Sequence, residues 1–262
     1  VESARGCPFS CSFCEIGERY YNKIKTSYDK TKKEIDWIAQ NKIEYVTDAN
    51  SNFGILFEQD YDLAKYVVKV KKKTSYPKAY RVTWAKDKGD KVLQIAKILE
   101  EADAQKAVTI ALQSMSPKVL KAIKRKNIDG GKLVEFIELY KKNDIASYIE
   151  LIWGLPEETL ESFIDGICSI MEYDFHNYLD IHLMMVLPNA PISSQDYRKK
   201  YGIKLNETQP RFSHRSNPKK LVSDTINIIT QTNSFTKEEW IEVHQFRWLV
   251  IFGHFLGSLQ FI

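Results

Sequence analysis

Residues 5–14 read Arg-Gly-Cys-Pro-Phe-Ser-Cys-Ser-Phe-Cys and place the thiols of Cys7, Cys11 and Cys14 at spacings of four and three residues. The whole chain has four cysteines, too few for a disulfide scaffold. Thiolates are soft ligands that suit iron–sulfur clusters and zinc. Structural zinc usually takes four protein ligands, whereas three thiolates leave one corner of a metal site open for chemistry. The spacing therefore predicts a metal centre with Cys7, Cys11 and Cys14 as its ligands.

The fourth cysteine, Cys168, is far from this loop in the sequence. It lies among Ile164, Ile167 and Met171 at helical spacing, so we expect a small buried hydrophobic residue rather than a ligand. The five histidines do not show the spacing of a zinc finger. A closed metal site would therefore need Cys168 or a histidine to fold back as a fourth ligand.

The composition is that of an ordinary globular protein. Hydrophobic residues make up 44% and charged residues 27% of the 262 residues, and the formal net charge is +4. These values argue against a disordered, collagen-like or membrane-spanning chain, and the charge is too small to indicate a nucleic-acid surface. The apolar stretch 246–262 includes polar residues and is shorter than the roughly 20 apolar residues of a bilayer span. We therefore expect a packed helix there, and neither nucleic acid nor membrane as a partner.

Hydrophobic patterning alternates between short β-rich runs and amphipathic helical stretches. The expected strands are a short one before Cys7 and the ranges 43–47, 79–84, 108–112, 147–152 and 178–187. The expected helices are 31–40, 60–74, 88–102, 117–124, 131–143 and 160–173. This alternation predicts parallel βαβ units with right-handed crossovers. Six units fit an open doubly wound sheet or an incomplete barrel, and in both folds function lies at the carboxyl ends of the strands.

The pattern changes after Pro188. Residues 189–218 have the composition of a loop, and helical stretches are expected over 218–231 and from residue 236 to the end. We therefore expect a core, residues 1–191, and a loop and helical extension, residues 192–262. The first motif begins almost at residue 1, with neither an initiator Met nor a signal peptide. We also expect an upstream region to be missing.

The cysteine loop resembles the cluster motif of the radical S-adenosylmethionine (SAM) superfamily. Besides the cysteine spacing it shares Gly6, Pro8 and Phe13, and the string is most similar to the subgroup that often carries an upstream cobalamin-binding domain. The resemblance implies an α/β fold, a partial (β/α)6 TIM-like barrel with a C-terminal helical appendage. It also implies a [4Fe-4S] cluster on the three cysteines, SAM on the remaining iron, and Phe13 beside the adenine.

Polar motifs follow the expected strands in the order that the resemblance predicts. After the second strand, Asp48, Asn50 and Asn52 lie where relatives meet the methionine end of SAM, and the choice between the two asparagines stays open. A turn built from Asp, Asn and Gly is the alternative there. After the fourth strand, Gln113 and Ser114 match a pair near the ribose and methionine, with a helix N-cap as the alternative for the serine.

Two further matches complete the set. In residues 149–159, Glu150 lies where the resemblance implies a ribose or substrate contact, and Trp153 lies near the adenine position. Glu157 departs from the family's segment, in which glycine is common at this place. Leu187 belongs to a string that resembles the segment after the sixth strand, which also contacts SAM.

The resemblance implies an enzyme that cleaves SAM reductively to a 5′-deoxyadenosyl radical for hydrogen abstraction from a small-molecule or peptide substrate. With cobalamin bound by a region outside this chain, the outcome would be methyl transfer to an unreactive carbon. An electron donor such as flavodoxin or ferredoxin and a cytoplasmic location are further expectations. The alternative is a non-catalytic binding module stabilised by zinc or a cluster, for which the ordered strand-end motifs have no explanation.

Overall fold

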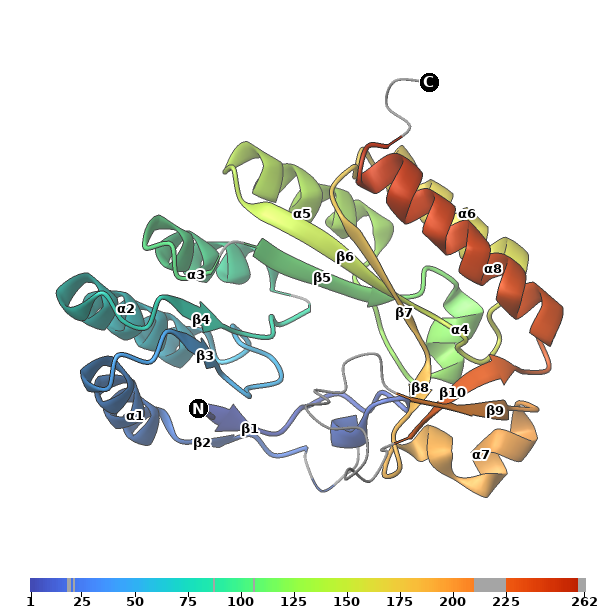
Figure 1. Ribbon diagram of the computed structural model, residues 1–262, viewed down its shortest axis with the longest axis horizontal. Helices are drawn as coiled ribbons and strands as arrows, with labels where there is room; N and C mark the ends of the chain where they lie inside the picture. Colours follow the sequence, from blue (N-terminus) through green and yellow to red (C-terminus); the bar gives the residue numbers. More distant parts are fainter. Residues whose placement is uncertain (18–19, 21, 87, 106, 210–224, 259–262) are drawn as a thin grey trace, which may run out of the picture.

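The computed structural model describes residues 1–17, 20, 22–86, 88–105, 107–209 and 225–258. Strands and helices alternate along the first two thirds of the chain (Figure 1). The strands of this part are β1 (Ala4–Arg5), β2 (Lys25–Thr26), β3 (Tyr45–Thr47), β4 (Ala79–Arg81), β5 (Ala107–Gln113), β6 (Ala146–Trp153) and β7 (Leu179–Leu183). The helices are a 3-10 turn (Glu15–Gly17), α1 (Tyr28–Gln40), α2 (Phe57–Thr74), α3 (Gly89–Glu101), α4 (Pro117–Ala122), α5 (Gly130–Lys142) and α6 (Leu160–Glu172).

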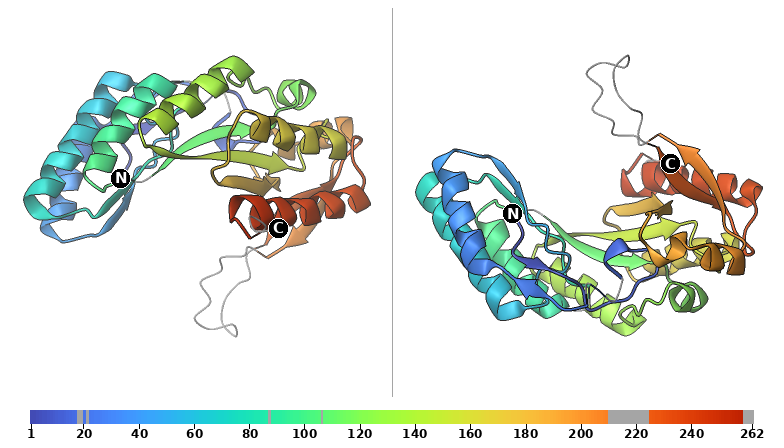
Figure 2. Two further views of the ribbon diagram at one scale, coloured as in Figure 1. Left: turned by 90° about the horizontal axis from the view of Figure 1, so that it is seen from above. Right: turned by 90° about the horizontal axis from the view of Figure 1, so that it is seen from below.

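The strands form an open arc. β3 pairs in parallel with β4, and β5, β6 and β7 form a parallel sheet. Backbone hydrogen bonds connect the separate parts of the arc. Ala49 N, after β3, donates to Val1 O before β1, and Tyr80 N in β4 donates to Ala104 O before β5, both at 2.9 Å. The helices lie along the outer side of the arc (Figure 2). The partial (β/α)6 barrel expected from the resemblance is confirmed.

Side chains on the central strands alternate between the helix-covered face and the concave face. In β6, Ile149, Leu151 and Trp153 are buried, whereas Glu150 and Ile152 between them are partly exposed. This is the period of two that a strand imposes. Glu150 therefore faces the concave side of the arc, where the strand ends converge.

The core lies between the strands and the helices. Phe53, Tyr80 and Trp84 meet edge to face, with ring centroids 6.4 and 6.3 Å apart, a geometry that adds about 0.5–1.5 kcal/mol per pair to the burial itself. Helix α6 begins with a capping box between Thr159 and Ser162, which satisfies backbone groups at its first turn. These features fix the ends of the elements that approach the concave side.

The C-terminal part differs from the sequence-based expectation. It contains β8 (Met185–Val186), a 3-10 turn (Pro191–Ser193), α7 (Gln195–Lys200), β9 (Lys204–Thr208), β10 (Ile226–Gln231), α8 (Lys237–Leu249) and a π-helix (Val250–Phe255). The helix predicted over 218–231 is wrong for residues 226–231, which form the centre of an antiparallel sheet in the order β8-β10-β9. Four of the five residues 226–230 are β-branched, Asn227 being the exception, and this composition favours a strand. Residues 218–224 of the predicted helix lie outside the described residues.

The end of the described chain is helical, as expected. Helix α8 lies beside α6 (Figure 1) and continues into the π-helix. No helix within the described ranges is long and apolar enough to cross a membrane. The division into a core, 1–191, and an extension, 192–262, stays a prediction.

Candidate active site

The cysteine loop, residues 5–14, is hydrogen-bonded to the rest of the fold through Ser12. Ser12 N donates to Ile123 O, and Ser12 O accepts from Ile192 N, both at 2.9 Å. The buried Ser12 hydroxyl lies 3.0 Å from the hydroxyl of Tyr197 on α7. The position of this loop thus depends on segments that are distant in the sequence.

The three cysteines of this loop line one pocket of about 180 Å³ at the carboxyl ends of the strands. Polar side chains from three strands join them: Asn52 follows β3, Gln113 ends β5, and Glu150 lies in β6. The other lining residues are Phe9, Phe13, Ile16, Ser51, Thr83, Trp84, Lys86, Ala111 and Arg125. Convergence at this edge is what a parallel βα arrangement predicts for a functional site.

A second loop, which we call the β3 loop (residues 48–56), is held by buried carboxylates. Asp48 accepts from two backbone N–H groups, at 2.9 and 3.1 Å, and from Tyr80 Oη at 2.7 Å. Asn50 is also buried, and its Oδ1 accepts from Asn52 N at 3.0 Å. Asp48 and Asn50 hold the loop and do not line the pocket, whereas Asn52 does.

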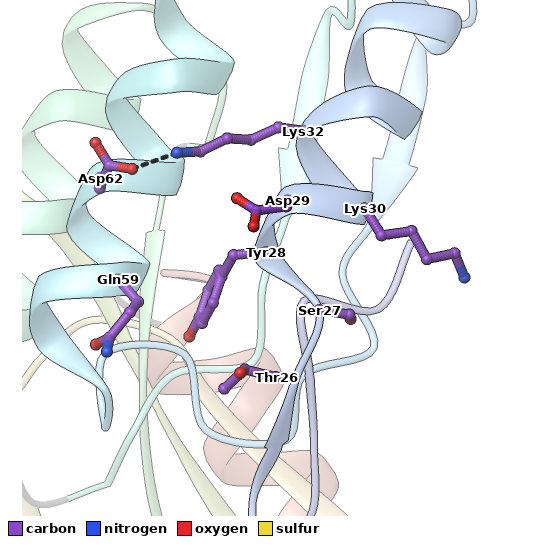
Figure 3. Close-up of a pocket in the computed structure, with 8 residues that line it drawn as sticks. All are labelled: Thr26, Ser27, Tyr28, Asp29, Lys30, Lys32, Gln59 and Asp62. Atoms are coloured by element: carbon purple, nitrogen blue, oxygen red, sulfur yellow. Dashed lines mark hydrogen bonds and ion pairs between the residues drawn. The ribbon is translucent and has the colours of Figure 1, made fainter.

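Asp60, near the start of α2, is the other carboxylate of this network. Its Oδ2 accepts from Gly54 N at 2.7 Å and Leu56 N at 3.2 Å, and its Oδ1 accepts from Tyr28 Oη at 2.7 Å. Gly54 has a φ of 102°, a conformation that favours glycine. Burial raises the pKa of Asp60 to about 6. Tyr28 also lines a separate polar pocket of about 380 Å³ near the starts of α1 and α2 (Figure 3).

Gln113 and Glu150 approach the cysteines from neighbouring strands. Gln113 has a φ of 69°, next to an irregularity in the pairing of β5 with β6, and such backbone strain costs about 1–3 kcal/mol and gathers at functional sites. Burial raises the pKa of Glu150, and Asp180 adds to this effect, whereas His182 and Arg125 oppose it. Within the described residues, neither side chain has a hydrogen-bond partner, so both can bond to a ligand in the pocket.

Besides Asp48 and Asn50, three more of the expected cofactor contacts do not line the pocket. Ser114 is buried, donates to Glu158 Oε2 at 2.6 Å, and accepts from Ser116 N at 3.0 Å. Trp153 is fully buried against aromatic rings of α6 and the C-terminal part. Leu187 is half-buried and packs against the core. Their roles at the cofactor stay predictions.

The structure also places Glu157, where the sequence departs from the family's segment, and Cys168, the cysteine outside the cluster motif. Glu157 has a φ of 66°, in the left-handed region where glycine is the common choice. Cys168, predicted to be buried, is exposed, because Phe163, Ile167 and Ile170 form the buried face of α6. Cys168 does not line the pocket and so does not supply a fourth ligand there.

Comparison with known proteins decides the family. Residues 1–166, more than half of the chain, match the family model described as the Radical SAM superfamily. The chain belongs to the radical SAM superfamily. Membership implies a [4Fe-4S] cluster and SAM as cofactors.

Two curated relatives match almost the whole chain. It is 33% identical over 256 residues to the cobalamin-dependent radical SAM methyltransferase TokK of Streptomyces tokunonensis. It is 32% identical over 254 residues to the 2-(S-pantetheinyl)-carbapenam-3-carboxylate methyltransferase of Streptantibioticus cattleyicolor. Both alignments cover 97% of this chain but only 37% of the relative.

Solved radical SAM structures share the fold. The methyltransferase TsrM from Kitasatospora setae, with its tryptophan substrate and a SAM analogue bound, aligns with a TM-score of 0.55 at 16% identity, over 74% of this chain and 37% of TsrM. Coproporphyrinogen III oxidase (HemN) from Escherichia coli gives 0.54 at 17% identity, over 74% of this chain and 45% of HemN. At these identities the likeness shows the fold alone.

The arrangement of the thiols fits a radical SAM cluster. Cys11 is buried, Cys7 and Cys14 are half-buried, and all three line the same pocket. Within the described ranges, no three His, Cys, Asp or Glu side chains are placed to hold a single metal ion. A cubane takes one thiolate at each of three separate iron corners, and three cysteines that line one pocket supply that ligand set.

Sequence patterns did not identify Arg125 and Lys86 as pocket residues. Arg125 Nη1 donates to Cys11 Sγ at 3.8 Å, and Lys86 Nζ lies 3.7 Å from the centre of the Phe9 ring. Both residues occur in lysine-rich stretches that are typical of a solvated surface. Only the folded chain brings them to the pocket that the cysteines line.

Proposed function

We propose that this chain is the core of a radical SAM enzyme that cleaves SAM reductively at a [4Fe-4S] cluster and abstracts hydrogen from a substrate. The observation that carries the proposal is a single pocket lined by Cys7, Cys11 and Cys14 together with polar side chains from three strands. When bound, the cluster and SAM supply one-electron cleavage of a C–S bond and a 5′-deoxyadenosyl radical. The chain's own residues would ligate the cluster, orient SAM and exclude water from the pocket.

The side chains that line the pocket offer different kinds of contact to the parts of SAM. Phe13 offers an aromatic face against which the adenine packs. Asn52 and Gln113 offer amide groups to the methionine end, and Glu150 offers a carboxylate to the ribose hydroxyls. Trp84, a buried residue that also lines the pocket, helps to keep water from the reactive species.

Anaerobic reconstitution with iron and sulfide tests the cluster. We expect a brown protein with about four irons per chain. Cys7→Ala, Cys11→Ala and Cys14→Ala should each abolish the colour, and Cys168→Ala, at an exposed position outside the pocket, should retain it. With SAM and dithionite, the protein should release 5′-deoxyadenosine. A colourless protein that binds only zinc, in all four variants alike, would establish the binding module instead.

Cobalamin-dependent methyl transfer to an unreactive carbon is the finer form of this proposal. It is supported by the two relatives of 33% and 32% identity, both named as methyltransferases, one of them cobalamin-dependent. The cobalamin would be bound by a region outside this chain, upstream of the core (1–191) and its extension (192–262).

Product analysis of the natural protein, produced with added cobalamin, tests methyl transfer. SAM that donates its methyl group leaves S-adenosylhomocysteine, whereas reductive cleavage leaves 5′-deoxyadenosine and methionine. Both sets of products, with a methylated substrate, would support the finer proposal. Only 5′-deoxyadenosine and methionine would refute methyl transfer and leave the core proposal intact.

We infer two further properties from the same chemistry. Radical SAM enzymes need a one-electron reductant, and a flavodoxin or ferredoxin would serve as that donor in a cytoplasmic setting. Support of 5′-deoxyadenosine release by a reduced flavodoxin in place of dithionite tests the donor. The substrate class, a small molecule or a peptide, stays a prediction.

A further inference from the structure

Two pocket residues, Asn52 and Arg125, donate hydrogen bonds to cysteine sulfurs. Asn52 Nδ2 lies 3.2 Å from Cys7 Sγ, and Arg125 Nη1 lies 3.8 Å from Cys11 Sγ. The two donors come from different segments, one from the β3 loop and one from the connection between α4 and α5. Neither donor residue belongs to the cysteine loop.

The Arg125 guanidinium is fixed by other hydrogen bonds. Nη2 donates to the carbonyl of Ala111 in β5, and Nε donates to Asn127 Oδ1 at 2.9 Å. Asn127 is held in turn, because its Nδ2 donates to Leu112 O at 2.8 Å and to Ser114 O at 2.9 Å. The end of β5 thus positions a positive charge against a buried thiol.

Asn52 is fixed in the same way by the β3 loop. Its backbone N–H donates to Asn50 Oδ1, and it is only 6% exposed. Its amide therefore reaches Cys7 from a rigid, largely water-free support.

We propose that Arg125 and Asn52 are positioning residues that raise the reduction potential of the cluster held by Cys7, Cys11 and Cys14. The inference rests on the proposed function. N–H···S hydrogen bonds draw electron density from thiolate ligands, and hydrogen bonds to the sulfurs are among the factors that set the potentials of iron–sulfur clusters. Reduction adds one electron from an external one-electron reductant, so the Arg125 charge stabilises the reduced state more than the oxidised state. The same charge attracts the electron most strongly where water screening is weak.

A redox titration of the anaerobically reconstituted chain, followed by the electron paramagnetic resonance of the reduced cluster, tests this inference. Arg125→Leu should bind wild-type amounts of iron and have a more negative midpoint potential. Arg125→Lys keeps the charge but loses the planar guanidinium group, so its midpoint potential should lie between those of the wild type and Arg125→Leu. Asn52→Ala should also shift the potential to more negative values, by less than Arg125→Leu because no charge is lost.

Lys126→Gln is the matched control. It removes one positive charge next to Arg125 in the sequence, but its side chain is exposed, so solvent screening should leave the potential close to that of the wild type. Should Arg125→Leu fail to fold, Arg125→Lys and Asn52→Ala decide the matter through the same titration. Unchanged potentials in variants with full iron content would overturn the inference and leave the proposed function standing. A wild-type chain that assembles no cluster would refute the proposed function itself.

Discussion

The cysteine loop and the β3 loop meet at one pocket but are held in different ways. The β3 loop is supported by Asp48, within it, and by Asp60, a few residues beyond it, whose carboxylates accept from its own backbone N–H groups. The cysteine loop instead takes its bonds from Ile123, Ile192 and Tyr197. The first loop is therefore held largely by carboxylates on it or close to it in the sequence, with further backbone bonds to Arg81 and Thr83. The second is held by parts of the chain more than 100 residues away. We expect damage to the first to appear mainly as lost stability, and damage to the support of the second as lost metal retention.

Removing the carboxylate of Asp48 should have the largest effect on folding. Asp48 is 1% exposed, and Asp48→Ala leaves two backbone N–H groups and the Tyr80 hydroxyl without their acceptor. Each unpaired buried group costs about 1–3 kcal/mol, so the free energy of unfolding should fall by at least about 3 kcal/mol. Denaturant unfolding measures this change.

Asp174→Asn is the control for Asp48→Ala, because Asp174 has a φ of 58°, a conformation that asparagine tolerates and alanine does not. Asp174 is an exposed carboxylate paired with Lys141 at 2.6 Å, and exposed ion pairs contribute little. Its loss should hardly change unfolding. Equal unfolding curves for Asp48→Ala and the wild type would show that the β3 loop is not supported as described.

The second carboxylate of the β3 loop should make stability depend on pH. Burial raises the pKa of Asp60 in the folded chain to about 6, so the folded state favours its protonated form. The contribution of Asp60 to stability is therefore greatest below its unfolded pKa and is lost as pH rises through about 6, by roughly 2–3 kcal/mol in total. Asp60→Asn should remove this slope when unfolding is measured between about pH 4.5 and 7.

Asp62→Asn provides the comparison for Asp60→Asn. Asp62 lies two residues further along α2, is exposed, and pairs with Lys32 at 2.5 Å across the polar pocket (Figure 3). This variant should keep the pH slope of the wild type. A wild-type slope in Asp60→Asn as well would assign the pH dependence to other groups.

SAM affinity should separate residues that face the pocket from residues that only support its walls. Gln113 and Ser114 are neighbours in sequence, yet Gln113 lines the pocket and Ser114 bonds to buried Glu158. Gln113→Ala should weaken SAM binding to the reconstituted protein about 10- to 100-fold, since a polar group of the ligand loses its partner. Calorimetric titration measures the affinity.

Ser114→Ala should lower stability and leave the SAM affinity near that of the wild type. Its hydroxyl is one of two that hydrogen-bond to the Glu158 carboxylate, the other being that of Ser162. If instead Ser114→Ala weakened SAM binding more than Gln113→Ala, Ser114 would be one of the cofactor contacts. The distinction between pocket-facing and supporting residues would then be wrong.

The sequence predicted the parts of this site that local patterns determine. Cys7, Cys11 and Cys14 lie in one short segment, so their spacing alone brings the thiols together. The alternation of strands and helices determines which edge the ends of β5 and β6 share. Gln113 and Glu150 consequently line the same pocket as the cysteines.

Tertiary contacts determine what the sequence could not predict. Arg125 reaches Cys11 only because Asn127 and the end of β5 orient it. Asn50 and Asn52 are alike in the sequence, and only the folded β3 loop turns one inward and the other towards the pocket. The sequence spacing predicts a helix where β10 lies, although most of its residues are β-branched and favour a strand. Pairing with β8 and β9, which lie elsewhere in the chain, determines the outcome.

Tyr197 links the C-terminal part to the cysteine loop, and removing its hydroxyl should give the smallest effect. Tyr197 Oη donates to Ala122 O at 2.8 Å and lies 3.0 Å from Ser12 Oγ, and burial raises its pKa to about 12, so it stays protonated in ordinary buffers. Tyr197→Phe keeps the ring, and should lower stability by about 1 kcal/mol and speed the release of iron to a chelator. Tyr201→Phe is the control, because its ring lies 4.8 Å from that of Tyr197 and its hydroxyl has no hydrogen bond within the described residues. Equal iron release in both variants would mean that the backbone bonds of Ser12 alone hold the cysteine loop.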